Sequence, residues 1–366
     1  MRIIETMDAA RAQGSARPAA VPQGLRFEDI HYSYGGVPAL RGITLDAREG
    51  EILCLLGRSG CGKSTLLNLA AGILPLQCGA ITLAGRTLAT PALNPPPERR
   101  SVGLVFQDGA LFLHLTVAQN IGFGLRERAV RQRTVEELLD QIGLAGMGAR
   151  YPHTLSGGQQ QRVAVARALA PSPDVLLMDE PYASIDISLR RKLREETRRL
   201  VKSRGCATIL VTHDPEEALE IADRIAVMEQ GRITQAGTGR ELYADPASLF
   251  VGLMAGSGAV LKARLEGGAA RTRYGRFARA QLSVRDADRS AERLDILIRP
   301  HAARLEADPD GLLITDIRHT GRSQIVTLSS AEADGLLLEI APEPAWTVGQ
   351  TVSIAPSGPP WPAFAR

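Results

Sequence analysis

Long hydrophobic runs are missing from this sequence of 366 residues. The best candidate for a membrane-spanning helix, Leu66 to Leu76, is short and is interrupted by Asn68, Gly72 and Pro75. A helix needs about 20 consecutive apolar residues to cross a bilayer, so the sequence predicts no such helix. Residues 1–22 lack the apolar segment of a signal peptide and are rich in Ala, Arg and Pro, so we expect a disordered lead-in.

Paired cysteines are missing as well. The four cysteines form no C-x-x-C pair and none of the spacings typical of zinc ligands. This pattern indicates reduced thiols, as in cytoplasm, rather than a disulfide framework. The residues concerned are Cys54, Cys61, Cys78 and Cys206.

A large excess of charge of one sign is the third absence, because 43 Lys and Arg residues are balanced by 40 Asp and Glu residues. The resulting net charge of +3 gives no support to a nucleic-acid partner. The densest basic run, Arg190 to Lys202, contains Glu195 and Glu196 and carries leucines on one face, which is typical of a solvated amphipathic helix. Length and a hydrophobic content of 44% favour two domains, each with its own core.

The sequence does contain a glycine-rich loop between an apolar run, Ile52 to Leu56, and a stretch of helix formers. The loop has the form G-x-x-x-x-G-K-[ST], in which backbone N–H groups and a helix N-terminus bind phosphate. Lys63 would reach the β- and γ-phosphates, and Ser64 would ligate Mg²⁺. An ordinary glycine turn is the alternative. The strand-like run before the loop and the helix formers after it favour the phosphate-binding motif instead. We therefore predict a nucleoside triphosphate site at Gly57, Arg58, Ser59, Gly60, Cys61, Gly62, Lys63, Ser64 and Thr65.

A second helix start of this kind follows Leu155. Ser156 and Gln159 have the S-x-x-Q spacing of a capping box, and Gly157 and Gly158 leave the first N–H groups of the helix uncovered. A capped helix start without side chains in front of it can bind an anion. A structural helix with a good cap is an equally good interpretation of this stretch alone.

Polar side chains follow three further apolar runs, and open α/β sheets bind ligands at such strand ends. Asp179 would hold Mg²⁺ through water, and Glu180 would polarise an attacking water. His213 is as compatible with a structural role as with a functional one. Residues 214–217 then have the pattern of a helix start, with an aspartate N-cap, a proline and a capping glutamate. The strand-end residues are Gln107, Asp179, Glu180 and His213.

Leu25 to Tyr34 is predicted to be an edge strand that ends at a glycine turn. Tyr34 would then lie one hairpin away from the glycine-rich loop, where its ring could stack on a nucleotide base. Packing is the alternative role for an aromatic ring at a strand end.

The pattern changes after Gly256-Ser257-Gly258, which we take as a domain boundary. Short strand-like runs with turn residues between them then follow, and they predict a small all-β barrel. The runs are residues 294–298, 311–317, 324–328, 336–340 and 351–354.

Taken together, these motifs resemble those of the ATP-binding subunits of ABC transporters over about residues 25–255. The resemblance implies an α/β fold, a P-loop NTPase nucleotide-binding domain of the ABC type at residues 23–255, with ATPase activity. It implies that Tyr34 stacks on adenine, that Ser156 to Gln159 form the family signature, and that Asp186 lies in the loop that communicates across a dimer. It further implies the Mg²⁺-linked Asp179, the Mg²⁺- and water-sensing Gln107, the catalytic Glu180 and the switch histidine His213.

The resemblance also implies partners. Two copies would close head to tail, so that ATP on the Gly57–Thr65 loop of one copy meets Ser156 to Gln159 of the other. Residues 108–155 correspond to the helical subdomain that receives the membrane (permease) subunits. The chain would then lie peripherally on the cytoplasmic face of the cell membrane and act indirectly with a solute-binding protein.

Residues 256–366 resemble the transport-associated, OB-like domain of importer ATPases, chiefly at Ile298-Arg299-Pro300. Such a domain favours uptake over export. It would either brace the dimer or sense a regulatory ligand, and the residues leave both roles open.

The sequence departs from the family pattern at two places. Ala183-Ser184-Ile185-Asp186 differs from the usual loop while keeping its aspartate, and Leu113 stands where relatives commonly have proline.

The cargo is suggested by one loop. Gln107-Asp108-Gly109 resembles the corresponding loop of ferric-iron importers, with polyamine, sulfate, thiamine and phosphonate importers as alternatives. A soluble ABC ATPase outside transport is a further alternative, although a second cassette and a long coiled-coil insertion are both missing. Intact Lys63, Asp179, Glu180 and His213 argue against a vestigial ATPase.

Overall fold

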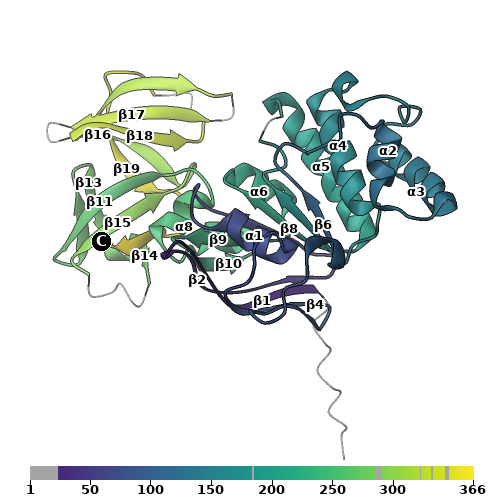
Figure 1. The fold of residues 1–366 in the computed structure, drawn as a ribbon. Coiled ribbons are helices and arrows are strands. Elements are labelled where there is room, and N and C mark those ends of the chain that lie inside the picture. The colour runs from purple at the N-terminus through teal and green to yellow at the C-terminus, as the bar shows by residue number, and fades with distance from the viewer. Residues whose placement is uncertain (1–23, 184, 286–290, 322, 331–332, 343–345) are drawn as a thin grey trace, which may run out of the picture.

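The computed structural model describes residues 24–366 except 184, 286–290, 322, 331–332 and 343–345 (Figure 1). The lead-in expected at residues 1–22 and Ser184 of the variant loop lie outside these described residues. A six-stranded sheet of order β10-β9-β3-β8-β7-β6 forms the centre of the first part of the chain. Its strands are β3 (Ile52–Leu56), β6 (Val102–Val105), β7 (Val175–Asp179), β8 (Ala207–Thr212), β9 (Arg224–Glu229) and β10 (Arg232–Gly237).

Strand register brings the predicted site residues to one edge of this sheet. β3, β6, β7, β8 and β9 run parallel, and β10 pairs antiparallel with β9. Leu56 pairs with Thr212, and Asp179 pairs with Val211. The carboxyl ends of β3, β7 and β8 therefore meet at the same edge, where ligands bind in sheets of this type.

Both faces of the central sheet are covered, which explains its continuous apolar runs. Ile52, Cys54 and Leu56 of β3 face a core shared with α4 (Gly157–Leu169), α5 (Ile187–Arg204) and α6 (Pro215–Ile221). Leu53 and Leu55 face the second core, which includes α1 (Lys63–Ala71). Successive strand residues point to opposite faces, so a strand with two covered faces must be apolar throughout.

A four-stranded antiparallel sheet of order β2-β1-β4-β5 completes the second core. The prediction that residues 25–34 form an edge strand is wrong, because β1 lies between β2 and β4. Its alternation of buried and exposed residues reflects a sheet with one solvated face, which gives the same pattern in any of its strands. The strands are β1 (Gly24–Tyr34), β2 (Val37–Arg48), β4 (Cys78–Leu83) and β5 (Arg86–Ala89).

Residues 117–141 form two helices separated by a short turn. α2 (Val117–Ile121) ends in a 3₁₀ turn at Gly122–Gly124, and α3 (Arg128–Gln141) follows. Two glycines in one turn weaken helix propensity at this point, which accounts for the break. Figure 1 shows α2 and α3 beside α4, away from the antiparallel sheet. Further 3₁₀ turns span Pro97–Arg99, Pro152–Thr154 and Arg279–Gln281.

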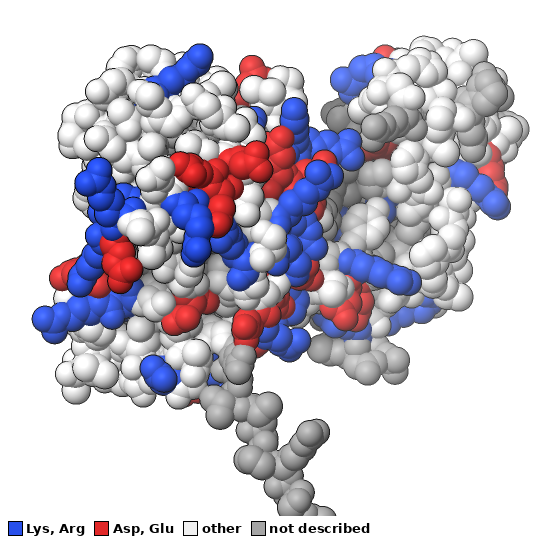
Figure 2. Space-filling view, turned by 90° about the vertical axis from the view of Figure 1, so that its right-hand side faces the viewer, with Lys and Arg blue, Asp and Glu red and all other residues white. Residues whose placement is uncertain are grey.

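The basic run at residues 190–202 lies on α5, as the sequence predicts. Its cations pair with carboxylates, for example Lys192 with Glu196 at 4.0 Å and Arg198 with Asp223 at 2.7 Å. Figure 2 shows that basic and acidic side chains are interspersed on the face of the molecule that forms the right-hand side of Figure 1. Within the described ranges, no helix combines the length and the apolar character needed to cross a bilayer.

The C-terminal part is all-β, as predicted, and consists of two sheets on a shared core. The sheet orders are β13-β12-β11-β15-β20-β14 and β18-β17-β16-β19. Sequence patterns predicted strands near β15 to β19 but missed those at residues 259–284 and 361–365. The strands are β11 (Ala259–Glu266), β12 (Ala269–Thr272), β13 (Gly275–Ala278), β14 (Leu282–Val284), β15 (Arg293–Ile298), β16 (Ala303–His319), β17 (Gln324–Ser330), β18 (Ala333–Ile340), β19 (Thr351–Pro356) and β20 (Trp361–Ala365).

Arg299 joins the two parts of the chain. α7 (Gly239–Ala244) and α8 (Leu249–Met254) precede the boundary that we propose at residues 256–258. The buried Arg299 guanidinium donates to the carbonyl oxygens of Gly252 at 2.7 Å and Gly256 at 2.9 Å. It also lies over the Tyr243 ring, 4.2 Å from its centroid. These contacts explain the arginine of the Ile298-Arg299-Pro300 motif as a structural link.

Candidate functional site

The glycine-rich loop connects β3 to α1, and its glycines are required by close backbone contacts. A Cβ atom on Gly57 would lie 2.4 Å from the carbonyl oxygen of Met228 and 2.8 Å from Cys61 Sγ. Gly62 has a φ of 106° at the start of α1, a conformation that favours glycine. No side chain among the described residues caps α1, so the N–H groups of its first turn remain available to an anion.

Lys63 is the first residue of α1 and is almost fully buried. Its Nζ donates to the carbonyl oxygens of Gly57 at 2.7 Å and Arg58 at 3.0 Å, and lies 3.8 Å from Cys61 Sγ. Within the described part of the chain, this ammonium forms no direct ion pair with a carboxylate, and a bound phosphate would supply the opposite charge.

Ser64 and Asp179 meet across the central sheet. Ser64 Oγ donates to Asp179 Oδ1 at 3.1 Å. Burial raises the pKa of the Asp179 carboxyl, and the hydrogen bond from Ser64 opposes that shift. A hydroxyl and a carboxylate are the oxygen ligands that Mg²⁺ prefers, and they lie next to the ammonium of the loop.

Glu180 and His213 form a pair at the ends of β7 and β8. His213 Nδ1 lies 3.0 Å from Glu180 Oε1, and the Glu180 backbone N–H donates to the Val211 carbonyl oxygen at 2.9 Å. Glu180 has a φ of 44°, in the left-handed region that non-glycine residues rarely adopt. Backbone strain of this kind is typical of functional positions.

Tyr34 lies at the end of β1, where the residue is 49% exposed. Its hydroxyl is 3.3 Å from Thr65 Oγ1, and its ring makes an edge contact with Tyr32 at 4.9 Å between centroids. The side chain thus contacts Thr65 and Tyr32, while about half of the residue's surface remains open to solvent.

A cavity of about 520 Å³ gathers many of these residues. It includes part of β2, at Val37 to Ala39, for which the sequence carried no motif. Its predicted lining residues are Tyr34, Ser59, Gly60, Gly62, Lys63, Ser64, Thr65 and Glu180. Arg58 points elsewhere, with its guanidinium 5.7 Å from the ring centroid of Phe250 in α8.

The other predicted site residues are not among those that line this cavity, namely Gly57, Arg58, Cys61, Gln107, Ser156 to Gln159, Asp179, Asp186 and His213. Gln107 is exposed beyond the end of β6. The exposed Ser156 caps α4 in a full capping box, in which its backbone N–H donates to Gln159 Oε1 at 2.9 Å. Asp186 caps α5, and hydrogen bonds from the backbone and side chain of Ser188 lower the pKa of its carboxyl. The predicted cap of α4 is therefore present, separate from the glycine-rich loop within one copy.

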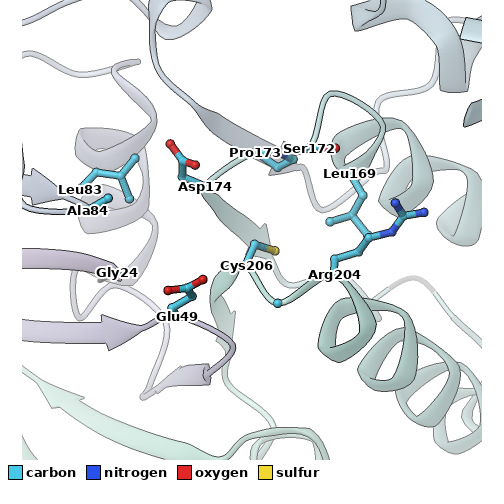
Figure 3. Close-up of a pocket in the computed structure, with 11 residues that line it drawn as sticks. Gly24, Glu49, Leu83, Ala84, Leu169, Ser172, Pro173, Asp174, Arg204 and Cys206 are labelled. Atoms are coloured by element: carbon cyan, nitrogen blue, oxygen red, sulfur yellow. The ribbon is translucent and has the colours of Figure 1, made fainter. Parts of the chain in front are cut away.

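A larger cavity of about 600 Å³ lies at the other end of the central sheet (Figure 3). It is bordered by Glu49, Asp174 and Cys206, which precede β3, β7 and β8, and it contains no motif residue. Ligands of open α/β sheets bind at the carboxyl ends of the strands. We therefore assign the site to the smaller cavity.

Residues 40–183 match the family model described as ABC transporter. A sulfate/thiosulfate import ATP-binding protein of Chromobacterium violaceum is 48% identical over 73% of this chain and 72% of its own length. The chain belongs to the ATP-binding subunits of ABC importers. A ferric-ion import ATP-binding protein of Rhodococcus jostii is 41% identical over 86% of this chain and 90% of its own length.

Solved ABC structures share the fold. CbiO1 from Clostridium perfringens, part of an ABC transporter complex, matches with a TM-score of 0.56 and 30% identity. The match covers 62% of this chain and 92% of that one. The α/β nucleotide-binding fold and the ATPase class expected from the motifs are thus confirmed.

Sequence patterns missed the role of Glu217. The pattern at residues 214–217 predicted a capping glutamate, but Glu217 instead accepts a hydrogen bond from Thr212 Oγ1 at 2.9 Å. Asp214 caps α6, accepting from the backbone N–H groups of Glu216 at 2.9 Å and Glu217 at 3.4 Å. The capping pattern correctly placed Glu217 in the first turn of a helix, but it did not indicate that the side chain of Glu217 is buried against Thr212.

Proposed function

We propose that this chain hydrolyses Mg-ATP at the 520 Å³ cavity and that this hydrolysis drives solute uptake through separate membrane subunits. One observation carries the proposal: the Glu180–His213 pair and the Ser64–Asp179 pair adjoin the buried Lys63 at one sheet edge. A base, a pair of oxygen ligands and a cation are the groups that phosphoryl transfer requires.

Each residue has a separate task. The N–H groups of the Gly57–Thr65 loop and the ammonium of Lys63 bind the phosphates. Ser64 and Asp179 would hold Mg²⁺, with Gln107 as a further ligand, and a bound ion there would supply positive charge for the phosphate oxygens. Glu180 accepts a proton from the attacking water, and His213 orients the Glu180 carboxylate.

Tyr34 binds the adenine ring in this proposal, because this half-exposed aromatic residue lines the cavity beside the loop and its hydroxyl lies next to Thr65. Tyr34→Ala should weaken ATP binding by about tenfold, since stacking of a base on an aromatic ring contributes about 1–3 kcal/mol. The maximal rate of hydrolysis should not change. Nucleotide titration of Tyr34→Ala beside Tyr34→Phe, which keeps the ring, measures the effect. Equal ATP affinity in Tyr34→Ala would assign the ring to packing.

A second copy of the chain completes the site in this proposal. α1 begins with uncapped N–H groups, and α4 begins with an exposed serine and two glycines that do not line the same cavity. Two anion-binding helix starts on one chain fit a head-to-tail dimer, in which each ATP is held by the loop of one copy and Ser156 to Gln159 of the other. Asp186, near the start of α5, would lie at that interface.

The membrane subunits dock on residues 108–155 in this proposal. Leu113 and Phe123 are 66% and 61% exposed there, and exposed apolar side chains of this kind are typical of protein contacts. The chain would then be peripheral on the cytoplasmic face of the cell membrane, and a solute-binding protein would act through the membrane subunits. Residues 256–366 would form the regulatory, OB-like domain.

Ferric iron is the cargo that we propose. The ferric-ion relative aligns along more of this chain than the sulfate relative, and the Gln107-Asp108-Gly109 loop supports the same assignment. In the intact complex, ferric-loaded binding protein should stimulate ATP hydrolysis several-fold over the unloaded protein. Sulfate-, polyamine-, thiamine- and phosphonate-loaded proteins serve as comparisons. If only one of these comparison proteins stimulates ATP hydrolysis, its ligand is the cargo instead of iron, and the ATPase assignment is unaffected.

A further inference from the structure

A buried carboxylate lies behind the turn that carries His213, and none of the tasks above uses it. Glu217, in the first turn of α6, is 4% exposed, and Thr212, at the end of β8, is 2% exposed. Burial of a carboxylate costs free energy unless its oxygens are hydrogen-bonded. Its contacts therefore indicate what it holds in place.

Glu217 acts on the backbone at both sides of His213. Thr212 Oγ1 donates to Glu217 Oε2 at 2.9 Å and accepts from the backbone N–H of Asp214 at 3.0 Å. A single hydroxyl thus connects the residue before His213 to the residue after it, and Glu217 determines which way that hydroxyl donates.

The same turn is bound to α5 from the other side. Arg194, which is buried, donates to Asp214 Oδ2 at 2.8 Å and to Glu220 Oε2 at 3.1 Å. α5, α6 and β8 pack together here (Figure 1). The exposed imidazole of His213 therefore projects from a backbone that buried polar contacts hold on two sides.

We propose that Glu217 is a positioning residue for ATP hydrolysis, which holds the His213 backbone through the Thr212 hydroxyl so that His213 stays in contact with Glu180. The proposal rests on the roles proposed above for Glu180 and His213. It assigns no contact between Glu217 and the nucleotide.

The ionisation of Glu217 makes the proposal testable through the pH dependence of ATP hydrolysis. Burial raises the pKa of the Glu217 carboxyl to about 7, and the hydrogen bond from Thr212 and the charge of Arg194 oppose that shift. An ionised carboxylate is a stronger acceptor than a neutral one, so the hold on Thr212 weakens as pH falls through about 7. The titratable groups that face Glu217 are Cys54 of β3, Glu180 at the end of β7, Tyr182, Arg194 of α5 and Asp214.

Folding stability should change in the opposite direction. Because the folded pKa is raised from 4.5 to about 7, the neutral form favours the fold. This contribution is present below about pH 4.5 and is lost as pH rises through about 7. Glu217→Gln keeps the shape and a neutral acceptor, so at pH 8 the variant should be slower than the parent without being less stable.

The test uses the full-length chain with Mg-ATP, and follows kcat, KM and thermal unfolding from pH 6 to pH 9. Glu217→Gln and Thr212→Val should each lower kcat about tenfold at pH 8, with KM for ATP changed less than about twofold. Glu217→Gln should also lose the fall in kcat below about pH 7. Thr212→Ser, which keeps the hydroxyl, should restore the parent rate, and Glu216→Gln, its exposed neighbour, should match the parent.

Parent-like kcat for Glu217→Gln at pH 8 would overturn the proposal, and so would equal impairment in Thr212→Ser and Thr212→Val. If Glu217→Gln does not fold, the comparison of kcat between Thr212→Ser and Thr212→Val tests the proposal. Glu180→Gln and His213→Ala are measured beside them. Rapid hydrolysis by those two variants would refute the proposed function, whereas their inactivity with a parent-like Glu217→Gln would refute the positioning role alone.

Discussion

Glu180→Gln should still bind ATP but hydrolyse it about 10²- to 10³-fold more slowly than the parent chain. The amide keeps the shape of the side chain and a hydrogen bond to His213, 3.0 Å away in the parent, but it cannot accept the proton of the attacking water. The groups that we propose to bind the triphosphate are untouched, so ATP should persist and the proposed head-to-tail dimer should accumulate. Single-turnover hydrolysis and size-exclusion chromatography with Mg-ATP measure both effects.

Glu49→Gln is the matched control, because Glu49 is an exposed carboxylate at the opposite end of the same sheet. It should hydrolyse ATP at the parent rate. Turnover by Glu180→Gln close to that of Glu49→Gln would remove Glu180 from the role of base.

Crosslinking of the closed dimer that we expect for Glu180→Gln tests its proposed head-to-tail arrangement. Cysteines introduced at Ser156 and Ser59 should be joined between copies by a short thiol crosslinker when ATP is present, in a background where the exposed Cys78 is alanine. Ser203→Cys, near the end of α5, replaces Ser156→Cys in the control and should give no product. A crosslink that forms equally without nucleotide, or not at all, would contradict the head-to-tail arrangement.

Lys63→Ala should abolish ATP binding over the range in which the parent chain saturates. The ammonium lies buried between the carbonyl oxygens of Gly57 and Arg58, and its removal leaves the loop without its cation. Hydrogen bonds to charged groups contribute about 1.5–3 kcal/mol each, so loss of two such contacts to phosphates weakens affinity by at least about 100-fold. Titration with a fluorescent ATP analogue measures the change.

Lys262→Ala controls for removal of a lysine elsewhere, since Lys262 is exposed on β11 in the C-terminal part. Thermal unfolding of Lys63→Ala separates loss of binding from loss of fold. ATP affinity equal to that of Lys262→Ala would refute the assignment of the phosphate loop.

The central sheet was largely predictable because its signals are local. β3 is apolar throughout, and β7 is apolar up to Asp179 at its carboxyl end, so sequence alone indicated parallel strands with a site at one edge. β1 shows where such reasoning fails. Its half-buried pattern is shared by central and edge strands of a solvated sheet, and only pairing with both β2 and β4 decides its place.

Strands of the C-terminal part were predicted less well. β12 and β13 are short, and β14 is shorter still, so too few alternating residues distinguish them from loops. Their pairing partners lie elsewhere in the chain, as with β14 and β20. Long-range pairing of this kind leaves no mark on a short stretch of sequence.

The sequence by itself determined the chemistry of the site, because a phosphate loop is made by one contiguous strand, turn and helix whose glycines and lysine are all visible in nine residues, Gly57 to Thr65. Tertiary structure alone decided which distant groups meet there. The contact of Ser64 with Asp179 and that of Glu180 with His213 depend on strand register, and the burial of Glu217 depends on how α6 packs against α5 and β8. Register and packing are properties of the assembled sheet, since each is set by partners that lie far away along the chain.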